Sequence, residues 1–235
     1  MRGSSVPSRV ARALQDMIAE RRLKPGDALP SQRELTTLLN ASRPSVREGI
    51  SMLETLGLIR VEQRKGLFVA ASSGRTPLDF WTFEKGYDLR EVYQFRASFE
   101  PAALFLAFAE LRRSGLERLR AHAEALHTAA REGNAVAAAE QDTLFHDIIF
   151  DFCRNRLYQD MRRSLAKVMQ DSQWVPMVII DRVSDTAREH SAIVNAIEAG
   201  DQVAACKALE AHILAAARRC NLDLSLQTLP FQALA

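Results

Sequence analysis

Hydrophobic residues near the start of the chain recur at the three- and four-residue spacing of an amphipathic helix. This spacing predicts a helix over roughly residues 8–22, followed by a turn at 24–27, where proline and glycine are adjacent. The apolar stripe of this helix consists of Val10, Leu14, Met17 and Ile18.

Two shorter amphipathic segments follow, and each opens with a serine that can cap a helix. Ser31 precedes the first segment, and Glu34, three residues later, completes a capping box. Asn40 ends this segment, because asparagine tolerates the left-handed conformation of a helix stop. Ser42 precedes the second segment, whose Pro44 is compatible with a first helical turn. The order cap, helix, short turn, helix predicts a helix-turn-helix.

A hairpin is predicted directly after this motif. Gly57 ends the last helix, and residues 58–61 and 67–70 have the character of two short strands around a turn at 63–66. A hairpin in this place is the wing of a winged helix-turn-helix, which we expect to occupy residues 1–70.

Cations are concentrated in this N-terminal part. Residues 1–70 hold 12 Lys and Arg against 7 Asp and Glu, whereas the remaining chain holds 19 against 22. Arg43 and Arg47 lie four residues apart near the start of the third helix, where a recognition helix meets bases and phosphates, and Arg33 is placed for a phosphate contact. These observations favour double-stranded DNA as a partner over the alternative that the arginines only solvate a surface.

The rest of the chain shows helical spacing and no alternating strand pattern. Residues 71–78 are small and polar with glycine and proline, and predict a linker. An all-α helical bundle is expected over 79–222 and a tail over 223–235, so the fold class is mainly α. The expected helices are 88–110, 115–131, 135–153, 155–171, 185–199 and 201–220.

Three histidines lie on or beside the inward faces of these helices. They are His146, one turn after Asp142, and His190 and His212. Each one alone would be a hydrogen-bonded core residue. Together, three imidazoles and a carboxylate from three helices form a suitable ligand set for a divalent metal, so both interpretations stay open from the residues alone. The other histidines, His122 and His127, are interpreted as surface residues.

Several N-terminal motifs together carry a family resemblance. They are Leu23-x-Pro-Gly-Asp-x-Leu-Pro-Ser-x-Arg-Glu-Leu35, Ser42-Arg-x-x-Val-Arg-Glu48, Leu53-Glu54, Gly57-Leu58 and Gly66-x-Phe-Val69. This segment resembles the DNA-binding domain of GntR-type bacterial transcription regulators, from which it departs at Thr36, Asn40 and Arg64, the last standing where the wing often has glycine. The DNA contacts that the resemblance implies are Arg33, Ser42, Arg43, Ser45, Arg47, Lys65 and Gly66.

A second set of motifs lies in the helical part. It comprises Asp142-x-x-x-His146, Glu189-His190-x-x-Ile193, Ala196-Ile197-x-x-Gly200-Asp201 and His212. This set resembles the FCD ligand-binding domain of the FadR branch of GntR regulators. The resemblance implies that Asp142, His146, His190 and His212 hold zinc, nickel or manganese.

The same resemblance implies a small carboxylate effector near the metal. Arg96 is similar to an arginine of that family and could pair with a carboxylate. The alternative, an Arg96–Glu100 pair on a helix surface, fits the spacing of four residues equally well.

These features predict a ligand-responsive transcription regulator that binds a palindromic operator as a homodimer. A metal sensor is the alternative, and a metalloenzyme a weaker one, because we find no positioned nucleophile or separate general base. No apolar run reaches about 18 residues, and Met1 to Ser8 lack a signal peptide's apolar core, so we expect a cytoplasmic protein without a membrane partner. Three cysteines without paired spacing, Cys153, Cys206 and Cys220, are expected to be buried reduced thiols.

Overall fold

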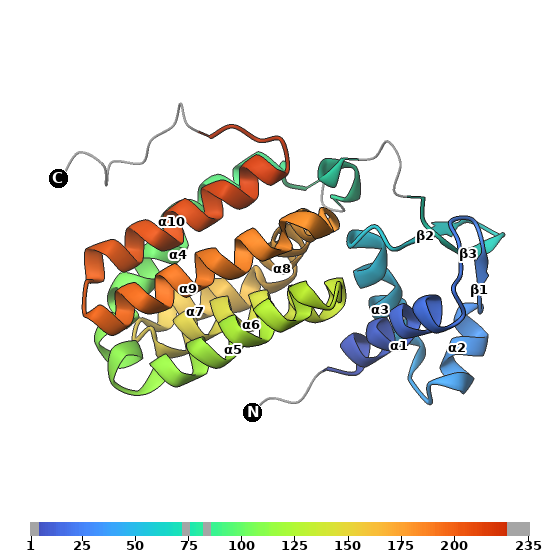
Figure 1. Cartoon of the computed structure of the whole chain (residues 1–235), viewed down its shortest axis with the longest axis horizontal. Helices are drawn as coiled ribbons and strands as arrows, with labels where there is room; N and C mark the ends of the chain where they lie inside the picture. Colours follow the sequence, from blue (N-terminus) through green and yellow to red (C-terminus); the bar gives the residue numbers. More distant parts are fainter. Residues whose placement is uncertain (1–4, 72–75, 82–85, 225–235) are drawn as a thin grey trace.

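The chain folds into two lobes that lie side by side (Figure 1). This computed structural model describes residues 5–71, 76–81 and 86–224. Part of the predicted linker, residues 72–75, and most of the predicted tail, residues 225–235, lie outside the described residues. The limits of the linker and tail therefore stay predictions.

The N-terminal lobe is a winged helix-turn-helix, as predicted. Its strands form one antiparallel sheet in the order β1-β3-β2, in which β2 and β3 are the wing. The two-residue strand β1 was not predicted, because two residues are too short to show an alternating pattern. The elements are α1 (Val6–Glu20), β1 (Ala28–Leu29), α2 (Gln32–Leu38), α3 (Arg43–Thr55), β2 (Ile59–Glu62) and β3 (Gly66–Val69).

Local start and stop signals act in this lobe as expected. Ser31 and Glu34 form the capping box at the start of α2. Asn40 has a φ of 45°, the left-handed conformation that ends the segment. Gly49 in α3 faces α1 so closely that an added Cβ would lie 2.8 Å from Val10. This glycine therefore lets the two helices of the lobe approach each other.

The second lobe is a bundle of helices, also as predicted. Its long helices are α4 (Leu89–Glu110), α5 (Leu116–Arg131), α6 (Ala135–Phe152), α9 (Val183–Ala199) and α10 (Gln202–Arg219), and its shorter ones are α7 (Arg156–Ser164) and α8 (Ala166–Trp174). A π-helical turn, η2 (Leu111–Gly115), joins α4 to α5. Three 3-10 turns complete the described chain: η1 (Pro77–Phe80), η3 (Val175–Val178) and η4 (Ile180–Arg182).

One predicted helix is wrong. The expected helix over 155–171 is broken at Leu165, whose φ of −101° and ψ of 13° interrupt the helix between α7 and α8. The buried residues of α7 are limited to Arg162, whereas α8 buries most of its second half. The chain therefore changes direction and burial at this point, and helical spacing alone does not show a one-residue break.

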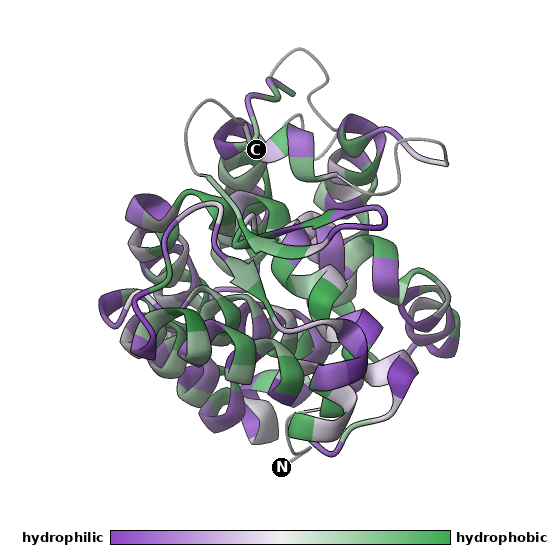
Figure 2. Ribbon diagram, turned by 90° about the vertical axis from the view of Figure 1, so that its right-hand side faces the viewer, coloured by the Kyte–Doolittle hydropathy of each residue, from purple (hydrophilic) through white to green (hydrophobic). Residues whose placement is uncertain are grey.

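The core of the bundle lies between α4, α6, α9 and α10, and a second apolar cluster continues from the N-terminal lobe into the bundle. Figure 2 shows hydrophilic residues mainly on the outward parts of the helices. At the boundary, Arg12 of α1 pairs with Glu140 of α6, and the Val136 amide donates to Gln15 Oε1 at 3.3 Å. The two lobes are thus joined through α1 and α6. Within the described residues, no helix is both long and apolar enough to cross a membrane.

Candidate functional site

The predicted DNA contacts on the helix-turn-helix lie at the solvent surface. Arg33 of α2 and Arg43 of α3 line one surface pocket together with Gln32 and Thr36. Arg47 follows one turn later on α3 and is also exposed. The arginines of both helices therefore share one region of the lobe, where a phosphate or a base edge can reach them.

Ser42 and Ser45 fix the start of α3. The Ser45 amide donates to the Ser42 hydroxyl at 3.3 Å, and the two hydroxyl oxygens are 2.9 Å apart. Ser42 is the N-cap of the helix. Because the first amides of a helix carry partial positive charge, this terminus favours an anion such as a DNA phosphate.

The wing tip presents two further cations. Lys65 is 74% exposed in its side chain and its Nζ lies 3.2 Å from a Glu62 oxygen. Arg64 has a φ of 62° and Gly66 a φ of 129°, so the tip holds an arginine in a conformation that favours glycine. Lys65 and Gly66 lie in the turn that the sequence predicted, and their role in DNA binding stays a prediction.

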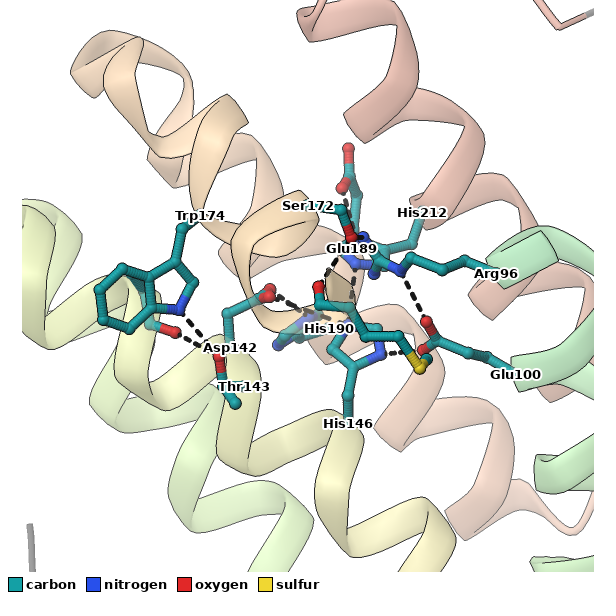
Figure 3. Close-up of polar contacts among 12 residues, drawn as sticks. Arg96, Glu100, Asp142, Thr143, His146, Ser172, Trp174, Glu189, His190 and His212 are labelled. Carbon is teal, nitrogen blue, oxygen red and sulfur yellow. Dashed lines mark hydrogen bonds and ion pairs between the residues drawn. The ribbon is translucent and has the colours of Figure 1, made fainter. Parts of the chain in front are cut away.

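The four predicted metal ligands come together inside the bundle (Figure 3). Asp142 and His146 come from α6, His190 from α9 and His212 from α10. One donor atom from each residue lies within 4.8 Å of the others, and all four residues are buried. The helical spacing in the sequence therefore placed these side chains correctly on the inward faces.

Two carboxylates, the buried Glu100 and the half-buried Glu189, contact the outer nitrogens of this cluster. Glu100 Oε2 of α4 is in short contact with His146 Nδ1, and Glu189 Oε2 of α9 lies 2.8 Å from His212 Nδ1. An ionised carboxylate only accepts hydrogen bonds, so each Nδ1 is the donor. Both imidazoles consequently present the lone pair of Nε2 to the centre of the cluster.

Each of these carboxylates is paired in turn with a buried arginine. Arg96 Nε donates to Glu100 Oε1 at 2.7 Å, and Arg219 donates to both oxygens of Glu189 at 2.9 and 3.0 Å. Arg96 also donates to the Ser172 hydroxyl at 3.1 Å. The Arg96–Glu100 pair therefore exists, but it lies inside the bundle and not on a helix surface. The role of Arg96 in binding an effector stays a prediction.

The surroundings shift the pKa values of two members of the cluster, His190 and Asp142. Burial lowers the pKa of His190 to about 4, although the nearby Asp142 carboxylate opposes this shift. Burial alone would raise the pKa of Asp142, but His190 and the other imidazoles hold that pKa below its usual range. Neutral imidazoles and an ionised carboxylate are the forms that bind metals.

The donor atoms of the cluster fit a cation better than they fit one another. His146 Nε2 and His212 Nε2 are 3.2 Å apart, and in the tautomers set by their carboxylates both present lone pairs. Asp142 Oδ1 lies 3.2 Å from His190 Nε2, yet neither atom has a well-oriented hydrogen bond within the described structure. Donors around a tetrahedral zinc lie about 3.4 Å apart, which follows from Zn–N bonds of about 2.0–2.1 Å. The four residues can therefore hold a divalent metal.

The sequence did not predict the residues that surround and orient the four proposed metal ligands. Arg219 and Ser172 had no assigned role, and Glu189 appeared only as part of a motif. Glu189 precedes His190 but orients His212 on the neighbouring helix. Spacing within one helix did suggest the Arg96–Glu100 pair, whereas contacts between helices have no such signal.

The remaining histidines and the cysteines lie outside the cluster. His122 Nδ1 is 2.7 Å from Gln141 Oε1, and His127 Nε2 is 3.2 Å from the Ser191 hydroxyl, so both half-buried rings make hydrogen bonds of their own. The three cysteines are free thiols, as expected, but only Cys153 and Cys220 are fully buried.

A winged helix-turn-helix joined to a helical bundle with a buried Asp and three His defines a class of two-domain transcription regulators. The family of bacterial regulatory proteins called gntR matches residues 7–69, and the FCD domain matches residues 91–215. The chain belongs to the GntR family of regulators that carry an FCD domain.

Relatives of similar length agree with this assignment. The chain is 28% identical to the uncharacterized HTH-type transcriptional regulator Rv0494 of Mycobacterium tuberculosis, over 91% of this chain and 89% of that protein. It is 25% identical to the transcriptional regulator LutR of Bacillus subtilis, over 84% and 93% respectively. Identity to the transcriptional repressor NanR of Cronobacter sakazakii is 28%, over 87% and 81%. A solved structure titled as a putative transcriptional regulator GntR from Rhodococcus sp. RHA1 has the same fold, with a TM-score of 0.53 and 20% identity over 92% of this chain and 97% of that one.

Proposed function

We propose that this regulator binds a palindromic operator through α3 and the wing, and that a small organic acid bound at a metal in the bundle changes its operator affinity. The observation that carries the second half of this proposal is the buried cluster of Asp142, His146, His190 and His212, whose donors face one another. The exposed arginines of α2 and α3 support the first half.

The proposed DNA contacts divide by chemistry. Arg43 and Arg47 near the start of α3 suit base edges and phosphates, since the N-terminal residues of a recognition helix enter the major groove. Arg33, with Ser42 and Ser45, suits phosphates, which position the protein without reading sequence. Lys65 and Gly66 at the wing tip suit the backbone beside the groove.

The proposed metal is zinc, nickel or manganese, held by one carboxylate and three imidazoles. A bound divalent ion would supply positive charge and an electrophilic anchor for the carboxylate of an organic acid. Arg96 is the proposed second anchor, because its guanidinium lies behind Glu100, which contacts the ligand His146. An entering carboxylate would compete with Glu100 for that guanidinium.

Helix α6 links the two proposed sites. Its first half contacts α1 through the Arg12–Glu140 pair, and Asp142 follows Glu140 by two residues. A shift of α6 on metal or effector binding would therefore reach the DNA-binding lobe directly. Such a shift changes operator affinity only if the ligand stabilises one arrangement of the lobes more than the other.

A metal sensor, in which the ion itself is the signal, is the second candidate function. The observation that favours it is that the cluster is buried and provides four protein ligands, enough to close a tetrahedral site. Operator affinity measured against metal concentration, without any organic acid, separates the two candidates. A metalloenzyme receives no support from the comparisons, since the relatives are named as regulators.

The proposal is tested by an electrophoretic shift on DNA from upstream of the protein's own gene. We expect sequence-selective binding that weakens as salt rises, because phosphate contacts release counterions. His190→Ala should lose metal by elemental analysis while keeping this DNA binding. Absence of selective binding would refute the proposed regulatory function. Full metal occupancy in His190→Ala would refute the assignment of His190 as one of four metal ligands.

A further inference from the structure

Gln173 carries a buried carboxamide that belongs to none of the motifs described above. It lies in α8, between Ser172 and Trp174, and is only 2% exposed. Neither its Oε1 nor its Nε2 has a hydrogen-bond partner among the described residues. Burying an amide without partners is unfavourable, so this carboxamide points to a polar group that is not part of the chain.

The neighbours of Gln173 show where its side chain points. Ser172 accepts a hydrogen bond from Arg96 of α4 at 3.1 Å, and the Trp174 indole donates to Thr143 of α6 at 2.9 Å. Successive residues of a helix are about 100° apart, so the Gln173 side chain leaves α8 between the directions of these two contacts. It is therefore aimed into the space between α4 and α6, both of which contact α8.

That space adjoins the cluster of proposed metal ligands. On α4, Arg96 pairs with Glu100, which contacts His146. On α6, Asp142 directly precedes Thr143. Figure 3 shows these side chains converging from the two helices. The unpartnered carboxamide of α8 therefore faces the place where we propose that an organic acid binds.

A metal ion alone would not satisfy this carboxamide. Asp142 Oδ1 and His190 Nε2 also lack hydrogen-bond partners among the described residues, but both are ligand atoms that a divalent ion would occupy. Gln173 Oε1 could bind a cation, whereas Nε2 is a donor and needs an acceptor. A hydroxyl group both donates and accepts, so it matches the whole carboxamide. An ionised carboxylate only accepts and would leave Oε1 unpaired.

We infer that Gln173 is a specificity-determining residue, and that the acid which binds at the cluster carries a hydroxyl group. The metal and Arg96 would bind the carboxylate of this acid, and the carboxamide of Gln173 would bind its hydroxyl. The inference rests on the proposed function, which requires an organic acid but does not say which kind. A site that hydrogen-bonds a hydroxyl discriminates against the analogue without it, because the buried amide is then left unpaired.

A matched set of four-carbon acids tests this contact. The full-length protein, loaded with zinc, is titrated in a calorimeter with butanoate, each of its monohydroxy derivatives and the diacid succinate. At least one hydroxy derivative should bind about 10–100-fold more tightly than butanoate and succinate. In Gln173→Leu the preference over butanoate should fall to about twofold or less, whereas the affinity for butanoate itself should not fall.

The melting temperature of the zinc-loaded protein without any acid gives a second readout. Leucine removes a buried polar group that has no partner, so Gln173→Leu should melt at the same or a higher temperature. Gln159→Leu is the matched control, because the half-buried Gln159 donates to the carbonyls of Phe150 and Cys153. This control should melt at a lower temperature and keep the preference for the hydroxy acid.

Several results would overturn the inference. Equal binding of butanoate and its hydroxy derivatives, or an unchanged preference in Gln173→Leu, would remove the hydroxyl contact and leave the proposed acid site standing. A lower melting temperature of Gln173→Leu would assign its amide a structural role instead. Binding of none of the acids would overturn both the inference and the proposed acid site. These measurements contain no DNA, so operator binding is judged separately.

Discussion

Replacing Glu189 with glutamine tests whether Glu189 orients the proposed metal ligand His212, because the change leaves His212 itself in place. Glutamine keeps the size of the side chain and an oxygen that can accept from His212 Nδ1. It removes the negative charge that Arg219 contacts through two hydrogen bonds of 2.9 and 3.0 Å. Burial opposes ionisation of Glu189, but His212 and Arg219 lower its pKa to about 2, so the native residue is charged at neutral pH.

Two effects of this change are expected. Substitution of a residue that orients a metal ligand lowers metal affinity by about 10–100-fold, which corresponds to about 1.4–2.7 kcal/mol. Without metal, the variant should also lose unfolding free energy, because its hydrogen bonds to Arg219 are no longer charged and Arg219 is only 8% exposed. The expected loss is about 1–2 kcal/mol. It should lie toward the lower end of this range, because the Glu189 side chain is 23% exposed.

Competition with a zinc-binding fluorophore measures the first effect, and chemical denaturation in the presence of a chelator measures the second. Glu198→Gln is the control on the same helix, because Glu198 is 55% exposed and its 2.9 Å contact with Arg120 is a solvent-screened surface pair that contributes little to stability. If both variants bound zinc within twofold of the wild type, the assignment of Glu189 as an orienting residue would be refuted.

Three further variants test other parts of the structure. Arg47→Ala should weaken operator binding by about 1–3 kcal/mol in fluorescence anisotropy and leave the metal content unchanged; equal affinity would remove Arg47 from the DNA contacts. Gly49→Ala should lower the free energy of unfolding by about 1–3 kcal/mol, because the new methyl would lie 2.8 Å from Val10 on α1; an unchanged melting temperature would contradict this close packing. Arg12→Ala removes the pair with Glu140 and should reduce the effect of metal on operator affinity by about 0.5–2 kcal/mol, while zinc affinity measured without DNA stays within a few-fold.

The N-terminal lobe could be predicted almost element by element, because its signals are local. Ser31 and Glu34 form one capping box, and Asn40 adopts the left-handed conformation, each within a few residues of the helix end that it determines. The wing followed from Gly57 and the turn near Gly66 in the same way. The family comparisons agree with this interpretation.

The bundle could be predicted only in part, because its site depends on contacts between helices. Spacing placed His146, His190 and His212 inward, and the structure brings their donors together. Spacing could not show that Glu189 on α9 reaches His212 on α10, nor that Glu100 bridges Arg96 and His146. These contacts depend on how neighbouring helices are rotated, which one helix's sequence does not specify.

The most direct test of the account is the operator affinity of one protein preparation in three states: stripped of metal, loaded with zinc, and loaded with zinc together with each of a panel of short organic acids. Fluorescence anisotropy at fixed salt should show a change of about 5–150-fold in at least one step, and His190→Ala should show no such change. Equal affinities in all three states of the wild type would contradict a switch controlled by the cluster of Asp142, His146, His190 and His212.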